Sequence, residues 1–260
     1  DASVVHSLAK WKRMALYNYD FYMGKGLYTD MNAIRRDESL DNLHSIYVDQ
    51  WDWEKIIDKK DRNLETLKKT VNNIHKCILA TLATLKIKYP SIKVHLPEDL
   101  YFISSQELLD MYPNLSSKER EYEITKEHKA VFIIGIGDKL SNGQAHDGRA
   151  PDYDDWKLNG DLIYYHEVLD CALEISSMGI RVDADSLVYQ LETSNHTDRM
   201  RYRYHQMILN NELPYTIGGG IGQSRLCMLL MGKAHIGEVQ SSLWDEYTLK
   251  LAKENGIIIL

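Results

Sequence analysis

A glycine-rich segment followed closely by an arginine is the strongest chemical signal in the chain. Residues 217–222 read Ile-Gly-Gly-Gly-Ile-Gly, and Arg225 follows at the start of an apolar stretch. Glycines let a backbone approach a flat ligand closely, and an arginine one turn into a helix can bind phosphate through its planar guanidinium. The pattern is typical of a nucleotide site. Taken alone it is only moderately specific, because a tight turn followed by a surface arginine has the same letters.

Acidic residues are the next candidates for chemistry. Glu174 lies in an apolar stretch, where a buried carboxylate needs a partner or a cation because an unpaired buried charge is very costly. The aspartates of residues 152–155 are, taken alone, more typical of a solvated turn. His6 and His146 have no nucleophile or metal-binding pattern around them, so we expect them to pack or to form hydrogen bonds.

The elements that must position these residues alternate along the chain without a linker rich in Pro, Gly or Ser. Strands are expected at residues 26–34, 44–53, 130–137, 162–165 and 172–182. Helices are expected at residues 61–89, 106–111 with Ser105 as N-cap, 185–193, 198–211 and 225–231, with a further helix begun by a capping box of Ser116 and Glu119. This order predicts an α+β fold, an antiparallel sheet flanked by helices, in a single domain over residues 1–260.

Composition narrows the class of protein. The chain has 260 residues, of which 44% are hydrophobic, which is enough for one large domain with a substantial core. Its net charge of -7 argues against nucleic acid as a principal partner, because nucleic-acid-binding surfaces are usually basic. Cys77, Cys171 and Cys227 are widely spaced and form no CxxC pair, which favours reduced thiols and a cytoplasmic protein. The longest apolar runs are too short to cross a membrane.

Five segments, in the right order, resemble the motifs of class II aminoacyl-tRNA synthetases of the aspartyl type. Residues 218–226 resemble motif 3, in which the arginine clamps ATP. Residues 34–38 resemble motif 2, in which an arginine binds the α-phosphate and an acidic neighbour orients the nucleotide; the spacing allows Arg35 or Arg36, and Arg35 is preferred, with Asp37 as its neighbour. Residues 49–54 resemble the strand that reads the amino acid, residues 6–12 the segment that places a lysine against the aspartate carboxylate, and residues 173–182 the strand whose glutamate holds magnesium beside ATP.

The likeness extends to the aspartate–ammonia ligases of the asparagine synthetase A family and covers nearly the whole chain. The most diagnostic block is Arg-Ala-Pro-Asp-Tyr-Asp-Asp-Trp at residues 149–156, which the tRNA synthetases lack. The resemblance implies a class II synthetase-like fold and the ATP-dependent amidation of L-aspartate with ammonia to L-asparagine through β-aspartyl-AMP, with release of AMP and pyrophosphate. It also implies Mg²⁺ as cofactor and a homodimer, with no nucleic acid or membrane as partner.

The same resemblance assigns roles to individual residues. It gives catalysis to Arg35, Arg225, Asp154 and Lys12. It gives aspartate binding to Ser7, Lys12, Gln50, Asp52 and Asp154. It gives ATP binding to Arg35, Asp37, Glu174, Ser177, Gly222 and Arg225, and magnesium to Glu174. Asp154 or Asp52 would hold the ammonium ion and take up its proton, and Asp154 is preferred.

Two alternatives stay open at this point. One is an aspartyl- or asparaginyl-tRNA synthetase-like catalytic domain, which the acidic composition, the block at residues 149–156 and the lack of a recognisable anticodon-binding module disfavour. The other is a non-catalytic synthetase paralogue that binds a ligand and regulates, which the presence of both Arg35 and Arg225 disfavours. Motif 1 is not recognisable, so we expect it before Asp1. The family has extra residues where Trp156 and Lys157 abut here, so a mobile loop is expected at that join.

Overall fold

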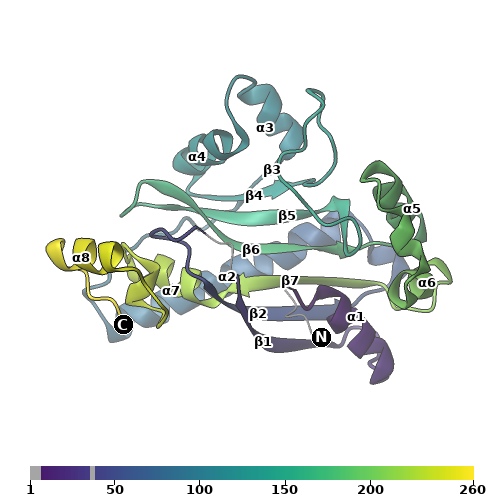
Figure 1. Cartoon of the computed structure of the whole chain (residues 1–260), viewed down its shortest axis with the longest axis horizontal. Coiled ribbons are helices and arrows are strands. Elements are labelled where there is room, and N and C mark those ends of the chain that lie inside the picture. Colours follow the sequence, from purple (N-terminus) through teal and green to yellow (C-terminus); the bar gives the residue numbers. More distant parts are fainter. Residues whose placement is uncertain (1–6, 36–38) are drawn as a thin grey trace.

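A computed structural model describes residues 7–35 and 39–260 and shows a seven-stranded sheet with helices packed around it (Figure 1). The strands are β1 (Gly26–Ile34), β2 (Tyr47–Ile56), β3 (Tyr101–Ser104), β4 (Ala130–Ile134), β5 (Asp154–His166), β6 (Cys171–Arg181) and β7 (Thr216–Gly222). Their order is β1-β2-β7-β6-β5-β4-β3. Neighbouring strands are antiparallel except β3 and β4, which are parallel. The α+β fold with a helix-flanked antiparallel sheet is confirmed, with one parallel pair at its edge.

Helices cover the two faces of the sheet unequally. They are α1 (Ala9–Asn18), α2 (Leu64–Lys88), α3 (Ser105–Met111), α4 (Ser117–His128), α5 (Ala184–Thr193), α6 (Arg203–Leu209), α7 (Gln223–Met231) and α8 (Glu246–Glu254). The apolar sides of α2 and α7 pack on one face, where residues such as Leu67 and Leu229 share a core with Phe132 and Met178. On the other face α3 and α4 bury Leu108 and Ile124 against β4 and β5. The part of that face formed by β2, β7 and β6 borders a cavity.

Several predicted boundaries shift for local physical reasons. The helix predicted at residues 106–111 begins one residue earlier, with Ser104 rather than Ser105 as N-cap, in a capping box with Glu107. The capping box of Ser116 and Glu119 is confirmed. The strand predicted at residues 130–137 ends at Ile134, because Gly135 and Gly137 have φ values of 82° and 120° that a strand does not allow.

Two other predictions were wrong in extent. The helix expected over residues 198–211 is a 3₁₀ turn (Thr197–Arg201) followed by the shorter α6. The strand expected at residues 162–165 is the last part of β5, which begins at Asp154. β5 continues through Trp156 and Lys157, and its pairing with β6 shifts register between Asp154 and Asn159. Helices α1 and α8 and strands β3 and β7 were not among the predicted elements.

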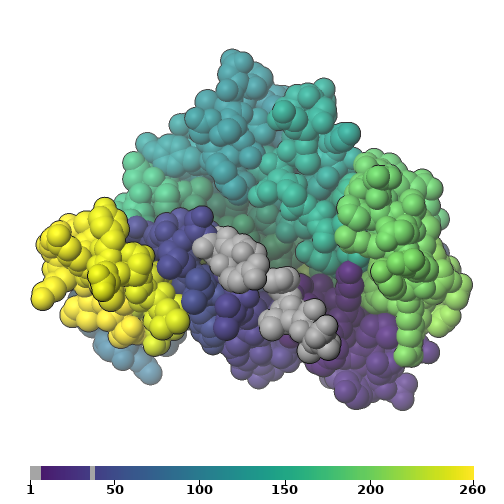
Figure 2. Space-filling model, viewed as in Figure 1, coloured from purple at the N-terminus to yellow at the C-terminus, as the bar shows by residue number. Residues whose placement is uncertain are grey.

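The surface view shows how the covering segments are arranged on one face. At the edges of the visible face lie the segment of α3 and α4 at the top, the segment of α5 and α6 at the right and the C-terminal segment with α8 at the left. The first helix and the first strands lie along its lower edge (Figure 2). Within the described ranges, no helix combines the length and the apolarity needed to span a membrane.

Candidate active site

One cavity of about 510 Å³ brings together residues that are far apart in the sequence. Every predicted site residue within the described ranges lines it. These residues are Ser7, Lys12, Arg35, Gln50, Asp52, Asp154, Glu174, Ser177, Gly222 and Arg225. The remaining predicted residue, Asp37, lies outside the described residues. The cavity therefore gathers residues from β2, β5, β6, β7, α1 and α7 at one place on the sheet.

A stripe of glycines on β7 makes room for polar side chains of β2. Alternate residues of a strand point to the same face, and Gln50, Asp52 and Glu54 of β2 stand opposite Gly222, Gly220 and Gly218 of β7. A Cβ atom on Gly220 would lie 2.9 Å from Oε1 of Gln50, so a larger residue there would displace it. The sequence suggested that these glycines admit a ligand. The structure shows that Gly218 and Gly220 first of all leave space for side chains of the protein.

Lys12 and Asp52 form a buried ion pair at the cavity wall. Nζ of Lys12 lies 2.6 Å from Oδ1 of Asp52 and also donates to the carbonyl oxygen of Gly219 at 3.1 Å. Burial lowers the pKa of Lys12, and the nearby charge of Arg181 lowers it further. Among the described residues, Oδ2 of Asp52 has no hydrogen-bond partner although it is buried. A buried acceptor of this kind is expected to receive a donor, and a ligand ammonium group in the cavity is a suitable one.

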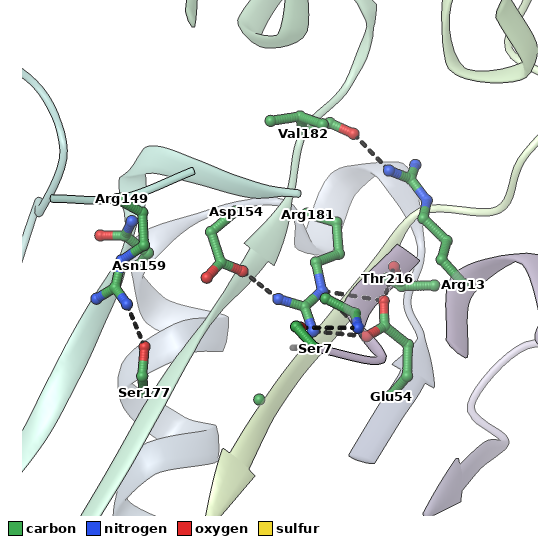
Figure 3. Close-up of polar contacts among 12 residues, drawn as sticks. Ser7, Arg13, Glu54, Arg149, Asp154, Asn159, Ser177, Arg181, Val182 and Thr216 are labelled. Atoms are coloured by element: carbon green, nitrogen blue, oxygen red, sulfur yellow. Dashed lines mark hydrogen bonds and ion pairs between the residues drawn. The ribbon is translucent and has the colours of Figure 1, made fainter. Parts of the chain in front are cut away.

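Arg181 is a cavity residue that the sequence did not single out. Its Nη2 lies 2.7 Å from Oε2 of Glu54, its Nε also donates to Glu54, and its Nη1 donates to Asp154 (Figure 3). Thr216 donates a further hydrogen bond to Glu54 at 2.6 Å. Glu54 and Asp154 are both almost fully buried, so Arg181 neutralises carboxylates that would otherwise be very costly. Arg181 also holds Oδ1 of Asp154, the residue that the sequence resemblance favoured for binding ammonium.

Arg149 is a second missed residue, and it begins the block that resembles the ligases. It donates to Ser177 and, over 2.6 Å, to Oδ1 of Asp161 (Figure 3 shows the contact with Ser177). Burial alone would lower the pKa of Arg149, but the carboxylates of Asp161 and Asp154 outweigh burial and raise it. Arg149 therefore places a permanent positive charge beside the predicted ATP-binding residue Ser177.

Glu174 is the carboxylate with the most unusual proton affinity in the cavity. Burial, followed by the charge of Asp161, raises its pKa to about 7, against opposing effects of Arg225 and Arg149. Nη1 of Arg225 lies 3.3 Å from the backbone carbonyl oxygen of Glu174. A cation placed next to such a carboxylate stabilises its ionised form.

The carboxylate of Glu174 fits magnesium that is bound together with a nucleotide. Within the described residues, no group of three or more His, Cys, Asp or Glu side chains is arranged to hold a metal ion. Mg²⁺ usually takes one or two carboxylates and completes its coordination with substrate phosphates and water. Glu174 lines the cavity and could supply one such carboxylate, whereas Asp161 is paired with Arg149.

Asp152, in the same block as Asp154, joins α1 to the α5–α6 segment. Its Oδ2 accepts from Lys10 at 2.6 Å, from His205 at 3.1 Å and from Arg199 at 3.2 Å. Burial would raise the pKa of Asp152, but hydrogen bonds from His205 and Lys10 bring it well below its usual value. A turn of solvated aspartates, the alternative from sequence, is therefore not what the structure shows: Asp152, Asp154 and Asp155 are buried and paired.

We expect Asp152→Asn to lower the free energy of unfolding by about 1–3 kcal/mol at pH 7. A folded-state pKa below the unfolded value means that the carboxylate stabilises the fold above about pH 4 and loses this effect as the pH falls further. Urea unfolding at pH 7 and at pH 3.5 measures this, and the gap between wild type and variant should narrow at the lower pH. An equal gap at both values would show that the charge of Asp152 is not the cause.

Comparison with known proteins identifies the family. The family model described as aspartate-ammonia ligase matches residues 1–256. The aspartate–ammonia ligase of Clostridium perfringens is 63% identical over 257 residues, which cover 99% of this chain and 76% of the relative. That of Ligilactobacillus salivarius is 62% identical, with 99% of this chain and 77% of the relative covered.

Solved structures resemble the fold at much lower identity. An asparaginyl-tRNA synthetase from Entamoeba histolytica in complex with asparaginyl-adenylate has a TM-score of 0.65 at 16% identity, and an aspartyl-tRNA synthetase from the same organism has 0.66 at 16%. The alignments cover 91% and 94% of this chain but only 55% and 52% of the synthetases, so the chain spans about half their length. At this identity the likeness concerns the class II synthetase fold alone. The chain belongs to the aspartate–ammonia ligase family and is an enzyme that makes asparagine from aspartate.

Proposed function

We propose that the chain uses ATP to activate the β-carboxylate of L-aspartate and then lets ammonia displace AMP. A carboxylate resists ammonia because its carbon is electron-rich and its oxygen is a poor leaving group. Attack of the β-carboxylate on the α-phosphate gives β-aspartyl-AMP and pyrophosphate, and attack of ammonia then gives asparagine and AMP. One observation carries this proposal: the buried ion pair of Lys12 and Asp52 lines the same cavity as Arg35 and Arg225. A site suited to an amino acid and a site suited to phosphate therefore share one cavity.

The region around Lys12 is suited to aspartate. The unpartnered Oδ2 of Asp52 would accept from the α-ammonium group, and Lys12 would bind a carboxylate of the substrate as a point charge. Arg181 lines the cavity here as well and offers a second cation. Ser7 and Gln50, which also line this cavity, would complete the hydrogen bonds to the amino acid.

The region around Arg225 is suited to ATP. Arg35 and Arg225 would bind the phosphates and stabilise the charge that develops on them in the transition state. Ser177 and Gly222 line the same cavity and would contact the nucleotide, and Asp37 would orient it. Bound at Glu174, Mg²⁺ would supply a positive charge that offsets the phosphate oxygens.

Asp154 is proposed to hold ammonium near the activated carbon. Because Arg181 fixes Oδ1 of Asp154, the carboxylate has a defined orientation and could receive a proton as ammonium becomes ammonia. Asp52 is the alternative residue for this step.

We further propose a cytoplasmic homodimer, and a molecular mass in solution equal to one chain would contradict the dimer.

Product analysis with aspartate, Mg-ATP and ammonium, without tRNA, tests this proposal. We expect asparagine, AMP and pyrophosphate in equal amounts, with much less asparagine when glutamine replaces ammonium. ADP with inorganic phosphate would contradict the adenylate. Exchange of pyrophosphate into ATP without any asparagine would instead favour a tRNA synthetase-like activity.

A further inference from the structure

We propose that Asp49 and Gln240 are positioning residues for the ATP region of the cavity. They fix the first turn of α7, and thereby Arg225, through hydrogen bonds from β2 and from the segment that precedes α8. The inference rests on the proposed phosphate-binding role of Arg225 and adds two residues that the motifs do not indicate.

The start of α7 has no cap of its own. Its N-cap residue is Gly222, which has no side chain to accept from the free N–H groups of the first turn. Asp49, on the neighbouring strand β2, supplies the missing acceptor. Its Oδ1 accepts from the backbone N–H of Ser224 at 3.2 Å, and its Oδ2 accepts from the hydroxyl of Ser224 at 2.5 Å. A carboxylate at this end of a helix is also favoured by the helix dipole.

Gln240 connects this cap to the C-terminal segment, which lies beside α7 (Figure 1). Its Nε2 donates to Oδ1 of Asp49 at 3.2 Å and to Oγ of Ser224 at 3.0 Å, and its Oε1 accepts from Ser45 at 2.5 Å. The side-chain amide of Gln240 is buried and uses both its donor hydrogens and its acceptor. A buried network whose members are all satisfied specifies one arrangement of the segments that carry it.

The network lies against the Arg225 side of the cavity. Ser45, Asp49 and Gln240 line the same cavity as Arg225, which immediately follows Ser224 in the first turn of α7. The position of that turn therefore determines where the guanidinium group of Arg225 can reach. Since three donors already converge on Asp49, its role is to orient the helix rather than to bind substrate.

Asp49→Asn tests the proposal because it keeps the shape of the side chain but removes its charge and one acceptor. We expect the KM for ATP to rise roughly five- to tenfold and kcat to fall with it, because Arg225 is also proposed to stabilise charge in the transition state. The KM for aspartate should change less than about twofold. ATP affinity measured by titration without aspartate should fall by the same factor. Gln240→Leu should also weaken ATP binding. In the double variant the loss of ATP affinity should be smaller than the product of the two single losses, because both residues belong to one network.

Asp245→Asn is the matched control. Asp245 also caps a helix, α8, by accepting from the backbone N–H of Thr248 at 2.9 Å and from its hydroxyl at 2.8 Å, but it is not among the residues that line the cavity. This variant should keep the wild-type affinity for ATP.

Two results would overturn the inference. One is a wild-type affinity for ATP in Asp49→Asn. The other is an equal rise in the KM values for ATP and aspartate, which would mean a general loss of structure. The direct ATP titration keeps this test separate from the proposed function, because it compares variants with wild type even if wild type forms no asparagine.

Discussion

Arg225→Met should lower kcat/KM for asparagine formation by a factor of about 10²–10³, the usual effect of removing a group that stabilises transition-state charge. The guanidinium group is proposed to contact the phosphates in the cavity that it lines with Glu174. The hydrogen bond from Nη1 of Arg225 to the carbonyl oxygen of Glu174 is long at 3.3 Å, so the fold should depend little on it. We therefore expect the thermal midpoint to stay within about 2 °C of wild type.

Steady-state kinetics with ATP and aspartate varied in turn measure this effect. Arg225→Lys should recover part of the activity, because lysine keeps the charge but loses the planar fork. Arg201→Met, at an arginine exposed on the surface, serves as the control and should be fully active. An Arg225→Met variant with more than a third of wild-type activity would contradict the role of Arg225 in binding phosphate.

Glu174→Gln should have opposite effects on activity and on stability. Activity should fall by a factor of about 10² or more, because the carboxylate is the proposed partner of Mg²⁺ near the phosphates. The ligand-free protein should nevertheless become more stable at pH 8. Burial and the charge of Asp161 disfavour the ionised form of Glu174, and the substitution removes that unfavourable charge.

The pH dependence follows from the direction of the shift. The pKa of Glu174 is about 7 in the folded chain, against an ordinary value of 4.5, so the folded state binds more protons between these values. Stability due to this group is therefore lost as the pH rises from about 4.5 to 7. The destabilisation above pH 7 is at most roughly 3 kcal/mol, and less because the residue is partly accessible. Glu174→Gln should then raise the midpoint at pH 8 by about 2–6 °C.

Thermal unfolding at pH 5 and pH 8, each without nucleotide, measures this gain. The gain should be present at pH 8 and nearly absent at pH 5. Glu119→Gln is the matched control, since hydrogen bonds from Ser116 lower the pKa of that exposed carboxylate, so the same substitution should not stabilise the protein. A loss of stability in Glu174→Gln at pH 8 would show that Glu174 is paired in the folded state.

The sequence predicted the cavity residues that belong to continuous motifs. Gly222 and Arg225 stand in one short segment, and Glu174 is conspicuous as a carboxylate in an apolar strand. Such signals are local, because the chemistry requires particular residue types at short spacing. The structure places them at one cavity without assigning their individual roles.

The residues that the sequence missed act through partners far away along the chain. Glu54 and Arg181 are separated by 127 positions, and Asp49 and Gln240 by 191. Nothing in local spacing shows that such residues meet. The sheet order β2-β7-β6 brings Glu54 and Arg181 together, and the segment that precedes α8 brings Gln240 to Asp49 of β2. The polar start of β5 was missed for the same reason: Asp154 and Asp155 fit a buried strand only because Arg181 and Arg62 neutralise them.

Transfer of oxygen from aspartate to AMP is the most direct test of the proposed adenylate. Aspartate labelled with ¹⁸O in its β-carboxylate would be turned over with Mg-ATP and ammonium, and the products analysed by mass spectrometry. The adenylate route predicts one ¹⁸O atom in the phosphate of AMP and the other in the amide of asparagine. Asparagine formed with unlabelled AMP, or with the label in inorganic phosphate, would contradict activation through β-aspartyl-AMP.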